Sequence, residues 1–314
     1  MIELRPYQQD SINKLRDSLR SGHRRTVLQL PTGAGKTEIA SAIISSLRAN
    51  QKRVMFTVPT LSLVDQTVEK FAKRGIDAGV IQANHWKTDH SKPVQVASIQ
   101  TLARRGVPEG IDYIIVDEAH LQFKSFLGWL NDPANKATPA IGLSATPWAR
   151  GMADTWSDLV IGATTEQLIH DKYLSDFRVF APAHKPDLSK VKTRMGDYAE
   201  DQLSLAMNKS ELVADIVETW MRKGPGFGTM CFCVDRLHAK SVQARFIRAG
   251  VNAGYVDAFS SLEDRQDVLK QFRNGDIPVI CNVGVLTTGV DEDVRCIILA
   301  RPTKSEILYC QIIG

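Results

Sequence analysis

The first half of the chain alternates short apolar runs with stretches of helical periodicity. Apolar runs of strand length occur at residues 26–30, 53–58, 78–81, 94–97, 113–116 and 140–143. Residues 36–47 and 61–74 instead place apolar side chains three and four positions apart, as an amphipathic helix does. Alternation of strands and helices predicts a mainly parallel sheet with helices packed on its faces.

A second alternation of the same kind begins near Phe177. Strands are predicted at residues 177–180, 229–234, 254–256, 278–282 and 296–299. Ser260 and Glu263 predict a capping box for a helix that ends at Arg273. Residues 185–196 contain few large apolar side chains and predict an exposed loop. We therefore predict an α/β protein with a first lobe over residues 1–165, a linker over 166–176 and a second lobe over 177–314.

Composition narrows the class of protein. The 314 residues carry a formal net charge of +4, which permits a polyanionic partner. The first ten residues are charged and lack the apolar core of a signal peptide, and no apolar run reaches membrane-spanning length. These features predict a cytoplasmic protein without a membrane partner. The five cysteines lack metal-site spacing, which argues against a disulfide framework or a zinc site, and Cys231 and Cys233 are interpreted as core residues.

A glycine-rich turn joins the first predicted strand to the first predicted helix. Its phosphate-binding candidates are Pro31, Thr32, Gly33, Ala34, Gly35, Lys36 and Thr37. Backbone N–H groups and the helix dipole attract anions at such a turn, Lys36 can reach the β- and γ-phosphates, and the Thr37 hydroxyl can ligate Mg²⁺. The strict pattern has glycine where this chain has Leu30. A tight turn with an incidental lysine is the alternative, and the strand–turn–helix context disfavours it.

An acidic pair follows the apolar strand predicted at residues 113–116. Asp117 can hold the Mg²⁺ shell, and Glu118 can orient or deprotonate the attacking water. A solvated acidic pair at a strand end would explain any isolated Asp-Glu dipeptide. The order and spacing relative to the glycine-rich turn favour a nucleotide site.

With the glycine-rich turn, Asp117-Glu118-Ala119-His120 and Ser144-Ala145-Thr146 in this order, the chain resembles the superfamily 2 helicases and translocases of the DEAH-box side. The resemblance implies two RecA-like lobes, each a mainly parallel sheet flanked by helices, with ATP bound in the cleft between them. It also implies catalysis by Glu118, Lys36 and His120, and a role for Ser144 and Thr146 in coupling ATP hydrolysis to nucleic-acid movement. Without the resemblance, residues 143–147 are only a strand end followed by a turn.

The segment Leu4-Arg5-Pro6-Tyr7-Gln8 resembles the adenine-recognition motif of the same family. The Gln8 amide offers one donor and one acceptor, which matches the edge of adenine, and Arg5 can stack on the base. The segment is equally a helix N-terminus with Pro6 in its first turn. The two interpretations are compatible.

Three strand-to-loop junctions resemble the elements with which the family holds a nucleic-acid backbone. The candidates are Pro59, Thr60 and Gln66 in the first junction, Gln100 and Thr101 in the second, and Thr287 and Thr288 in the third. Hydroxyls and amides bind phosphates without reading sequence. Each junction is ordinary by itself, so only their joint order favours the functional interpretation. Asp291 resembles the family's contact to the ribose of the nucleotide.

The last motif of the family is expected to continue past Gln311, a coupling residue, into a pair of arginines. The sequence stops at Gly314, before that pair. We therefore expect a second lobe that is incomplete at its C-terminus, and a chain that hydrolyses ATP poorly by itself. The phrases Leu-Arg-Pro-Tyr-Gln-Gln and Val-Leu-Thr-Thr-Gly most resemble the RadD-type repair ATPases and related phage helicases. An iron–sulfur helicase is disfavoured, because no cysteine lies between the glycine-rich turn and Asp117.

These patterns predict an ATP- and Mg²⁺-dependent helicase or translocase that acts on nucleic acid, with DNA favoured over RNA. A motor subunit of a type III restriction-like enzyme shares many of the motifs. A nucleic-acid-binding module that holds ATP as a structural ligand is the alternative from another class. A P-loop kinase is disfavoured, since it leaves the second lobe without a role.

Overall fold

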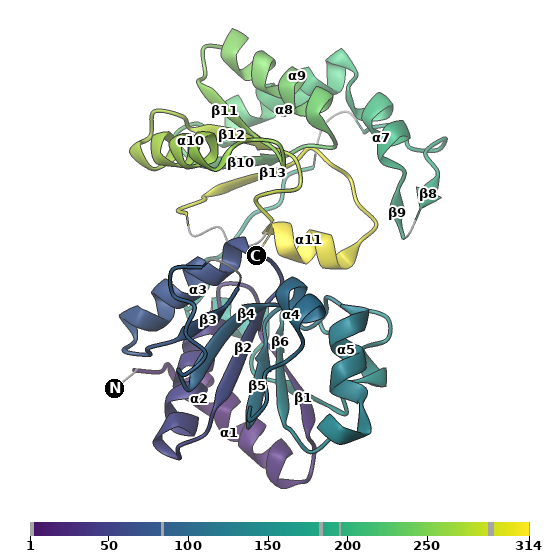
Figure 1. Ribbon diagram of the computed structural model, residues 1–314. Helices are drawn as coiled ribbons and strands as arrows, with labels where there is room; N and C mark the ends of the chain where they lie inside the picture. The colour runs from purple at the N-terminus through teal and green to yellow at the C-terminus, as the bar shows by residue number, and fades with distance from the viewer. Residues whose placement is uncertain (1–2, 83–84, 182–184, 195, 288–291, 314) are drawn as a thin grey trace. The chain divides into compact units, whose positions relative to one another are not determined.

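The computed structural model describes residues 3–82, 85–181, 185–194, 196–287 and 292–313 (Figure 1). Contacts within the chain divide it into two compact units, which we call unit 1 (residues 1–176) and unit 2 (residues 177–313). No helix among the described residues is both long enough and apolar enough to cross a membrane.

Unit 1 is built on a seven-stranded sheet whose paired strands are all parallel. The strands are β1 (Arg25–Gln29), β2 (Val54–Val58), β3 (Gly79–Ile81), β4 (Val94–Ser98), β5 (Tyr113–Val116), β6 (Ala140–Ser144) and β7 (Asp158–Ile161). Their order across the sheet is β3-β4-β2-β5-β6-β1-β7. Because every strand runs the same way, all carboxyl ends lie along one edge of the sheet, where α/β proteins place their ligands.

Helices cover both faces of this sheet, which makes unit 1 a three-layer structure (Figure 1). The helices are α1 (Pro6–Arg20), α2 (Lys36–Ala49), α3 (Ser62–Lys73), α4 (Ile99–Arg105), α5 (Lys124–Asn131) and α6 (Thr165–His170), with short 3₁₀ turns at η1 (Pro133–Asn135) and η2 (Met152–Asp154). The apolar faces of α1, α2 and α3 pack on one side of the sheet, and those of α4 and α5 pack on the other. Strands β2, β4 and β6 are therefore buried over their whole length.

Unit 2 repeats the architecture on a smaller scale. Its parallel strands are β10 (Thr229–Phe232), β11 (Ala253–Val256), β12 (Val279–Asn282) and β13 (Cys296–Leu299), in the order β11-β12-β10-β13. Its helices are α7 (Glu200–Met207), α8 (Ser210–Lys223), α9 (Arg236–Arg248), α10 (Leu262–Asn274) and α11 (Glu306–Ile313), and a two-stranded antiparallel ribbon joins β8 (Thr193–Arg194) to β9 (Asp197–Tyr198). Helices α8 and α9 pack on one face of the sheet, and α10 and α11 pack on the other.

Cysteines occupy the core of unit 2. Cys231 and Cys233 lie under α8 and α9 beside Cys281, and the three free sulfur atoms are within 4.8 Å of one another. Cys231 and Cys233 are at most 1% exposed, so the prediction that both are core residues is confirmed.

The predicted α/β fold class with two parallel sheets is confirmed, and most predicted strands agree with the observed ones to within two residues. Residues 177–180 are an exception, because they form no strand and pair with none in the described part of the chain. Phe177 and Phe180 are 61% and 53% exposed. The apolar residues of this stretch predicted a strand, but a strand also needs a neighbour that supplies hydrogen bonds.

The predicted capping residue of α10 is also wrong by one position. The N-cap is Ser261, whose hydroxyl accepts a hydrogen bond from the amide of Asp264 at 3.0 Å. The hydroxyl of Ser260 instead accepts from the amide of Asp257 at 3.0 Å and donates to its carboxylate at 3.1 Å. Ser260 therefore forms hydrogen bonds within the turn after β11, and Ser261 caps the helix. Residues 185–196 are mostly loop as predicted, but they also contain β8.

Candidate nucleotide-binding site

The glycine-rich turn connects the carboxyl end of β1 to the first residue of α2. Gly33 and Gly35 have φ angles of +76° and +77°, which side chains other than glycine rarely adopt. A Cβ atom on Gly35 would lie 2.5 Å from the side-chain nitrogen of Gln8. The amide of Glu38 donates to the carbonyl of Gly35 at 3.0 Å. Lys36 and Thr37, the first two residues of α2, lie where helix amides have no acceptor inside the helix and can bind an anion.

Lys36 begins α2 and turns its ammonium group back over the turn. Its Nζ donates to the carbonyl oxygens of Leu30 and Pro31 at 3.4 and 3.5 Å. Leu30, where the strict pattern has glycine, continues the course of β1 and donates its amide to the carbonyl of Ser144 at 3.1 Å. Its side chain is fully buried against Gly162, where a Cβ atom would lie 2.8 Å from the leucine. Leucine fits here because the position is extended and faces the core.

The acidic pair lies at the carboxyl end of β5. The amide of Asp117 donates to the carbonyl of Thr57 at 2.9 Å, and the amide of Glu118 donates to the Asp117 carboxylate at 3.1 Å. Glu118 has a φ of +49°, an unusual conformation for a residue with a side chain. Strained backbone of this kind is found most often at functional sites.

The ionisation of these groups is shifted by their surroundings. Burial, followed by the charge of Glu118, raises the pKa of Asp117 to about 7. Burial also raises the pKa of Glu118, and it lowers the pKa of His120 to about 4. The ammonium of Lys36 opposes the first two shifts and adds to the third, so its charge acts on all three side chains. The structure thus brings one cation and two carboxylates together at the edge of the sheet.

A chain of buried polar groups connects the acidic pair to the end of β6. Nδ1 of His120 lies 3.4 Å from the Glu118 carboxylate and 3.0 Å from the Ser144 hydroxyl. The same hydroxyl accepts a hydrogen bond from the amide of Thr146 at 3.0 Å. The Thr146 hydroxyl is buried and has no hydrogen-bond partner among the described residues. The predicted coupling residues of unit 1 are therefore in direct contact with the predicted catalytic ones.

The N-terminal segment is tied to the glycine-rich turn. Nε2 of Gln8 and the hydroxyl of Tyr7 both donate to the carbonyl of Ala34, at 3.2 and 2.9 Å. Oε1 of Gln8 accepts a hydrogen bond from the amide of Arg5 at 3.0 Å, where α1 begins. The guanidinium of Arg5 lies 5.1 Å from the ring centroid of Tyr173, whose ring is also 5.0 Å from that of Tyr7.

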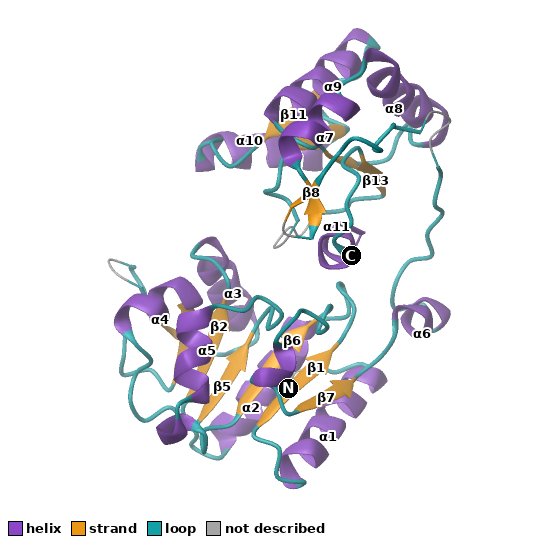
Figure 2. Cartoon of the chain, turned by 90° about the vertical axis from the view of Figure 1, so that its right-hand side faces the viewer, coloured by secondary structure: helices purple, strands orange, loops and turns teal. Residues whose placement is uncertain are grey.

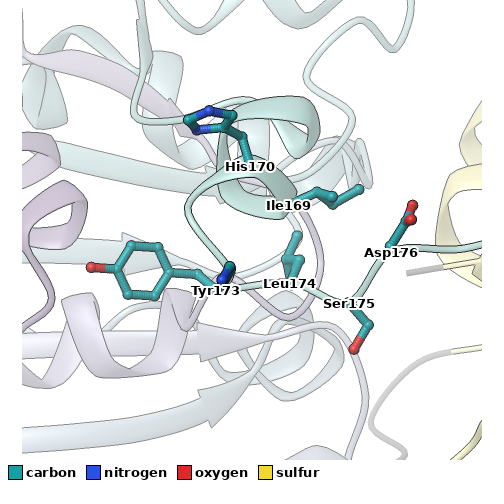
Figure 3. A pocket seen from close by; sticks show the side chains of 7 residues that line it. Ile169, His170, Tyr173, Leu174, Ser175 and Asp176 are labelled. Atoms are coloured by element: carbon teal, nitrogen blue, oxygen red, sulfur yellow. The ribbon is translucent and has the colours of Figure 1, made fainter.

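Tyr173 belongs to a segment that lines a pocket of about 510 Å³ beside the glycine-rich turn (Figure 3). The lining residues are Ile169, His170, Lys172, Tyr173, Leu174, Ser175 and Asp176. Leu174 lies beside the turn, since a Cβ atom on Gly33 would be 3.1 Å from its side chain. Sequence reasoning assigned these residues to a linker and missed their place in the site. No local motif marks them, and only their position after α6 brings them back to Arg5.

The predicted nucleic-acid contacts of unit 1 lie at the carboxyl ends of two adjacent strands, β2 and β4. Pro59 and Thr60 follow β2, and Gln66 is exposed on α3. Gln100 is exposed in the first turn of α4, and Thr101 contacts the Ser98 hydroxyl that caps this helix, with its amide donating at 3.1 Å. The structure therefore places the five residues at or just after the carboxyl ends of two neighbouring strands, with Gln66 and Gln100 exposed but Pro59 buried.

The remaining predicted residues belong to unit 2. Thr287 is half-buried in the loop after β12, and Gln311 lies on α11. Thr288 and Asp291, the other candidates in that loop, lie outside the described residues.

Sequence reasoning also missed a polar cluster at the carboxyl ends of β10 and β11. The Asp257 carboxylate is 2.7 Å from Nε of Arg236 and accepts a hydrogen bond from the Tyr255 hydroxyl at 2.6 Å. Burial acts to raise the pKa of Asp257, but hydrogen bonds from Tyr255, Ser260 and nearby amides lower it to about 2. The cluster borders a pocket of about 440 Å³ inside unit 2.

Comparisons with known proteins agree with this geometry. Residues 1–149 match the family described as type III restriction enzyme, res subunit, and residues 208–314 match the helicase conserved C-terminal domain. The chain is 32% identical to the putative ATP-dependent helicase IRC3 of Saccharomyces cerevisiae, over 99% of this chain and 49% of the yeast protein. The chain thus spans about half the length of that relative.

Two solved structures share the fold. The type ISP restriction-modification enzyme LlaBIII bound to DNA aligns with a TM-score of 0.73 and 18% identity, over 99% of this chain and 26% of the enzyme. Dbp5 of S. cerevisiae bound to RNA and ADP BeF₃, an L327V variant, aligns with a TM-score of 0.63 and 17% identity, over 100% of this chain and 84% of Dbp5. The two family models and the yeast relative support the superfamily predicted from the motifs, the superfamily 2 helicases.

Proposed function

We propose that this chain is the motor of an ATP-dependent helicase or translocase, which hydrolyses ATP to move along nucleic acid. The observation that carries the proposal is the meeting of Lys36, Asp117, Glu118 and His120 beside a glycine cradle at the carboxyl edge of the unit 1 sheet. The cradle suits a phosphate group, because two glycines with positive φ, Gly33 and Gly35, form the turn, and the helix N-terminus that follows it attracts anions.

The proposed division of labour follows from the chemistry of each group. Lys36 would exchange its two carbonyl partners for the β- and γ-phosphates. The Thr37 hydroxyl and the Asp117 carboxylate would hold Mg²⁺, which when bound neutralises charge on those phosphates. Oxygen ligands suit Mg²⁺, and an Asp117 whose pKa is about 7 without a cation gains most from one.

Glu118 is proposed as the catalytic base. The water oxygen bonds to the γ-phosphorus, the bond to the β–γ bridging oxygen breaks, and the Glu118 carboxylate takes the proton. A pKa raised by burial makes this carboxylate a stronger base than a solvated one. His120, whose pKa is lowered to about 4, stays neutral and transmits the state of the site to Ser144.

The adenine is proposed to bind where Arg5, Gln8 and Tyr173 meet. The Arg5 guanidinium stacks on the Tyr173 ring, and an adenine base could stack beside them or take the place of one of them. Gln8 is also tied to the Ala34 carbonyl, so base binding at Gln8 would be transmitted to the phosphate cradle. Tyr173 is the addition that the structure makes to the residues expected from the motif.

The nucleic acid is proposed to be DNA, bound through its phosphates at the carboxyl ends of β2 and β4, where Gln66 and Gln100 are exposed. Within unit 2, Thr287 is proposed as a further phosphate contact. The match of residues 1–149 to a restriction-enzyme family supports DNA over RNA. Measuring ATP hydrolysis with single-stranded DNA, duplex DNA and RNA separates the candidates. Stimulation by RNA alone would contradict the choice of DNA.

A pair of variants tests the active site. Glu118→Gln keeps the side-chain shape but cannot accept a proton, so ATP should still bind while phosphate release falls by at least about 100-fold. Lys36→Ala should weaken binding of a fluorescent ATP analogue as well, because it removes a charge from the phosphates. Glu69→Gln, an exposed position on α3, is the matched control and should behave as the parent. Turnover by Glu118→Gln at close to the parent rate would show that Glu118 is not the base.

A further inference from the structure

A tryptophan stands in the solvent on the loop between β3 and β4. The side chain of Trp86 is 80% exposed, although tryptophan is normally among the most buried side chains on average. Leaving so large a ring in water forgoes the burial that such side chains usually provide. Isolated exposed apolar residues are common, so what distinguishes Trp86 is the structure around it.

The residues before and after Trp86 both contact its indole ring. The imidazole of His85 stacks on the indole, with ring centroids 5.9 Å apart and an angle of 22° between the planes. The His85 side chain is only 6% exposed, contacts the Asp65 carboxylate of α3 at 2.8 Å through Nε2, and accepts the Lys87 amide at 3.1 Å through Nδ1. The Lys87 ammonium lies 5.0 Å from the centroid of the indole. An exposed ring is thus fixed in position by a buried partner.

The loop itself is fastened to the sheet and to its own ends. The Val80 amide donates to the Lys87 carbonyl at 3.0 Å, and the Thr88 hydroxyl donates to the Gln82 carbonyl at 2.8 Å. Lys87 forms no ion pair with a carboxylate in the described part of the chain, so its charge is available to a phosphate.

Trp86 also lies on the same edge as the proposed phosphate contacts. Strands β3, β4 and β2 are neighbours in the parallel sheet, so the loop after β3 follows the same row as Gln100 after β4 and Thr60 after β2. Figure 1 labels the three strands, and Figure 2 labels β2 together with helices α3 and α4. The contact from His85 to Asp65 fixes the loop to α3, one residue from Gln66. An exposed aromatic ring, a lysine and a row of phosphate-binding groups are the features that grip single-stranded nucleic acid.

We propose that Trp86 is a stacking platform for an unpaired base of single-stranded nucleic acid, with Lys87 drawing in the neighbouring phosphate and His85 holding the indole in place. The proposal rests on the nucleic-acid motor function proposed above, and it adds a binding site for bases to one for phosphates. A base offers its face only when it is unpaired, so the platform selects single strands over duplex.

The test measures binding of fluorescein-labelled oligo(dT) and of a labelled duplex of equal length by anisotropy at one salt concentration. Stacking of one base contributes about 1–3 kcal/mol, so Trp86→Ala should weaken single-strand binding by about 5- to 150-fold and duplex binding by less than about twofold. Trp86→Phe, which keeps a stacking face, should recover most of the loss. Leu159→Ala is the control, because it truncates an exposed apolar side chain on β7, which is the last strand at the other end of the strand order from β3. This variant should bind nucleic acid as the parent does.

Photo-crosslinking provides a readout that does not depend on a variant. Oligonucleotides containing 5-iodouracil should crosslink to Trp86 in the parent protein, as identified by peptide mass spectrometry. If the parent binds both oligo(dT) and the duplex, and Trp86→Ala binds each of them as tightly as the parent does, the stacking proposal is overturned and the motor function still stands. An equal loss of affinity for the single strand and the duplex would also overturn it, since Trp86 would then contact the nucleic-acid backbone, which both ligands share, and not an unpaired base. A parent that binds no nucleic acid would overturn both proposals.

Discussion

Two hydroxyl groups that stand two residues apart should respond in opposite ways to removal. Ser144 and Thr146 are both buried at the end of β6, at 0% and 1% exposure. The Ser144 hydroxyl holds two other buried groups, Nδ1 of His120 and the amide of Thr146, each at 3.0 Å. The Thr146 hydroxyl holds no described group. The variants are Ser144→Ala and Thr146→Val, and each removes one hydroxyl with little change of shape.

The expected magnitudes follow from the groups left behind. A buried donor without a partner costs about 1–3 kcal/mol and a lost hydrogen bond about 0.5–1.5 kcal/mol. Ser144→Ala takes the acceptor from the Thr146 amide and one hydrogen bond from His120, so it should lower the free energy of unfolding of unit 1 by about 2–4 kcal/mol. His120 keeps its contact with the Glu118 carboxylate at 3.4 Å in this variant. Thr146→Val removes a buried hydroxyl that is itself unsatisfied, so it should be neutral or stabilise by up to about 1 kcal/mol.

Urea denaturation followed by tryptophan emission measures the difference. Four of the five tryptophans, Trp86, Trp129, Trp148 and Trp156, belong to unit 1, so the signal reports mainly on that unit. With a slope of about 2 kcal/mol per molar urea, the midpoint should fall by roughly 1–2 M in Ser144→Ala and stay close to the parent value in Thr146→Val. Equal losses in the two variants would mean that shape and packing at this turn, rather than the Ser144 hydroxyl, stabilise it.

Two further predictions concern stability. His238 in unit 2 is fully buried, accepts the Val234 amide through Nδ1, and has its pKa lowered to about 4 by burial, against the opposing charge of Asp235. The unfolded chain binds this proton near pH 6.5, whereas the folded chain binds it only near pH 4. The free energy of unfolding should therefore be highest above pH 6.5 and fall by up to about 3 kcal/mol as the pH drops to 4. An NMR titration of the imidazole with a midpoint above pH 6 would contradict this. Gly142→Ala should cost about 1–3 kcal/mol by urea denaturation, since its Cβ atom would lie 2.8 Å from that of Ala119 and 3.0 Å from the Trp156 ring, whereas Gly128→Ala, with nothing within 4 Å, should be neutral or stabilising.

Local patterns were sufficient for most strands of the two sheets and for placing the glycine-rich turn near the acidic pair, but they missed β7 (Asp158–Ile161). Apolar runs such as 113–116 became strands because burial on both faces of a parallel sheet needs continuous apolar side chains. The glycine-rich turn and the acidic pair could be placed beside each other because both follow strands, and parallel strands end along one edge. Each of these inferences uses only short-range sequence and a general property of parallel sheets.

Contacts between distant segments were beyond such reasoning. Tyr173 contacts Arg5 across 168 residues of sequence, and Gln8 contacts Ala34 across 26. No local sequence pattern predicts either contact. Residues 177–180 are mostly apolar, as a strand is, but pair with no described strand, because pairing depends on which segments lie alongside. Trp86 would have been read as one more apolar residue until its exposure and its His85 partner were known. Periodicity along the chain fixes which side chains seek burial, whereas the packing of remote segments decides which polar and aromatic groups meet at the edge of the sheet.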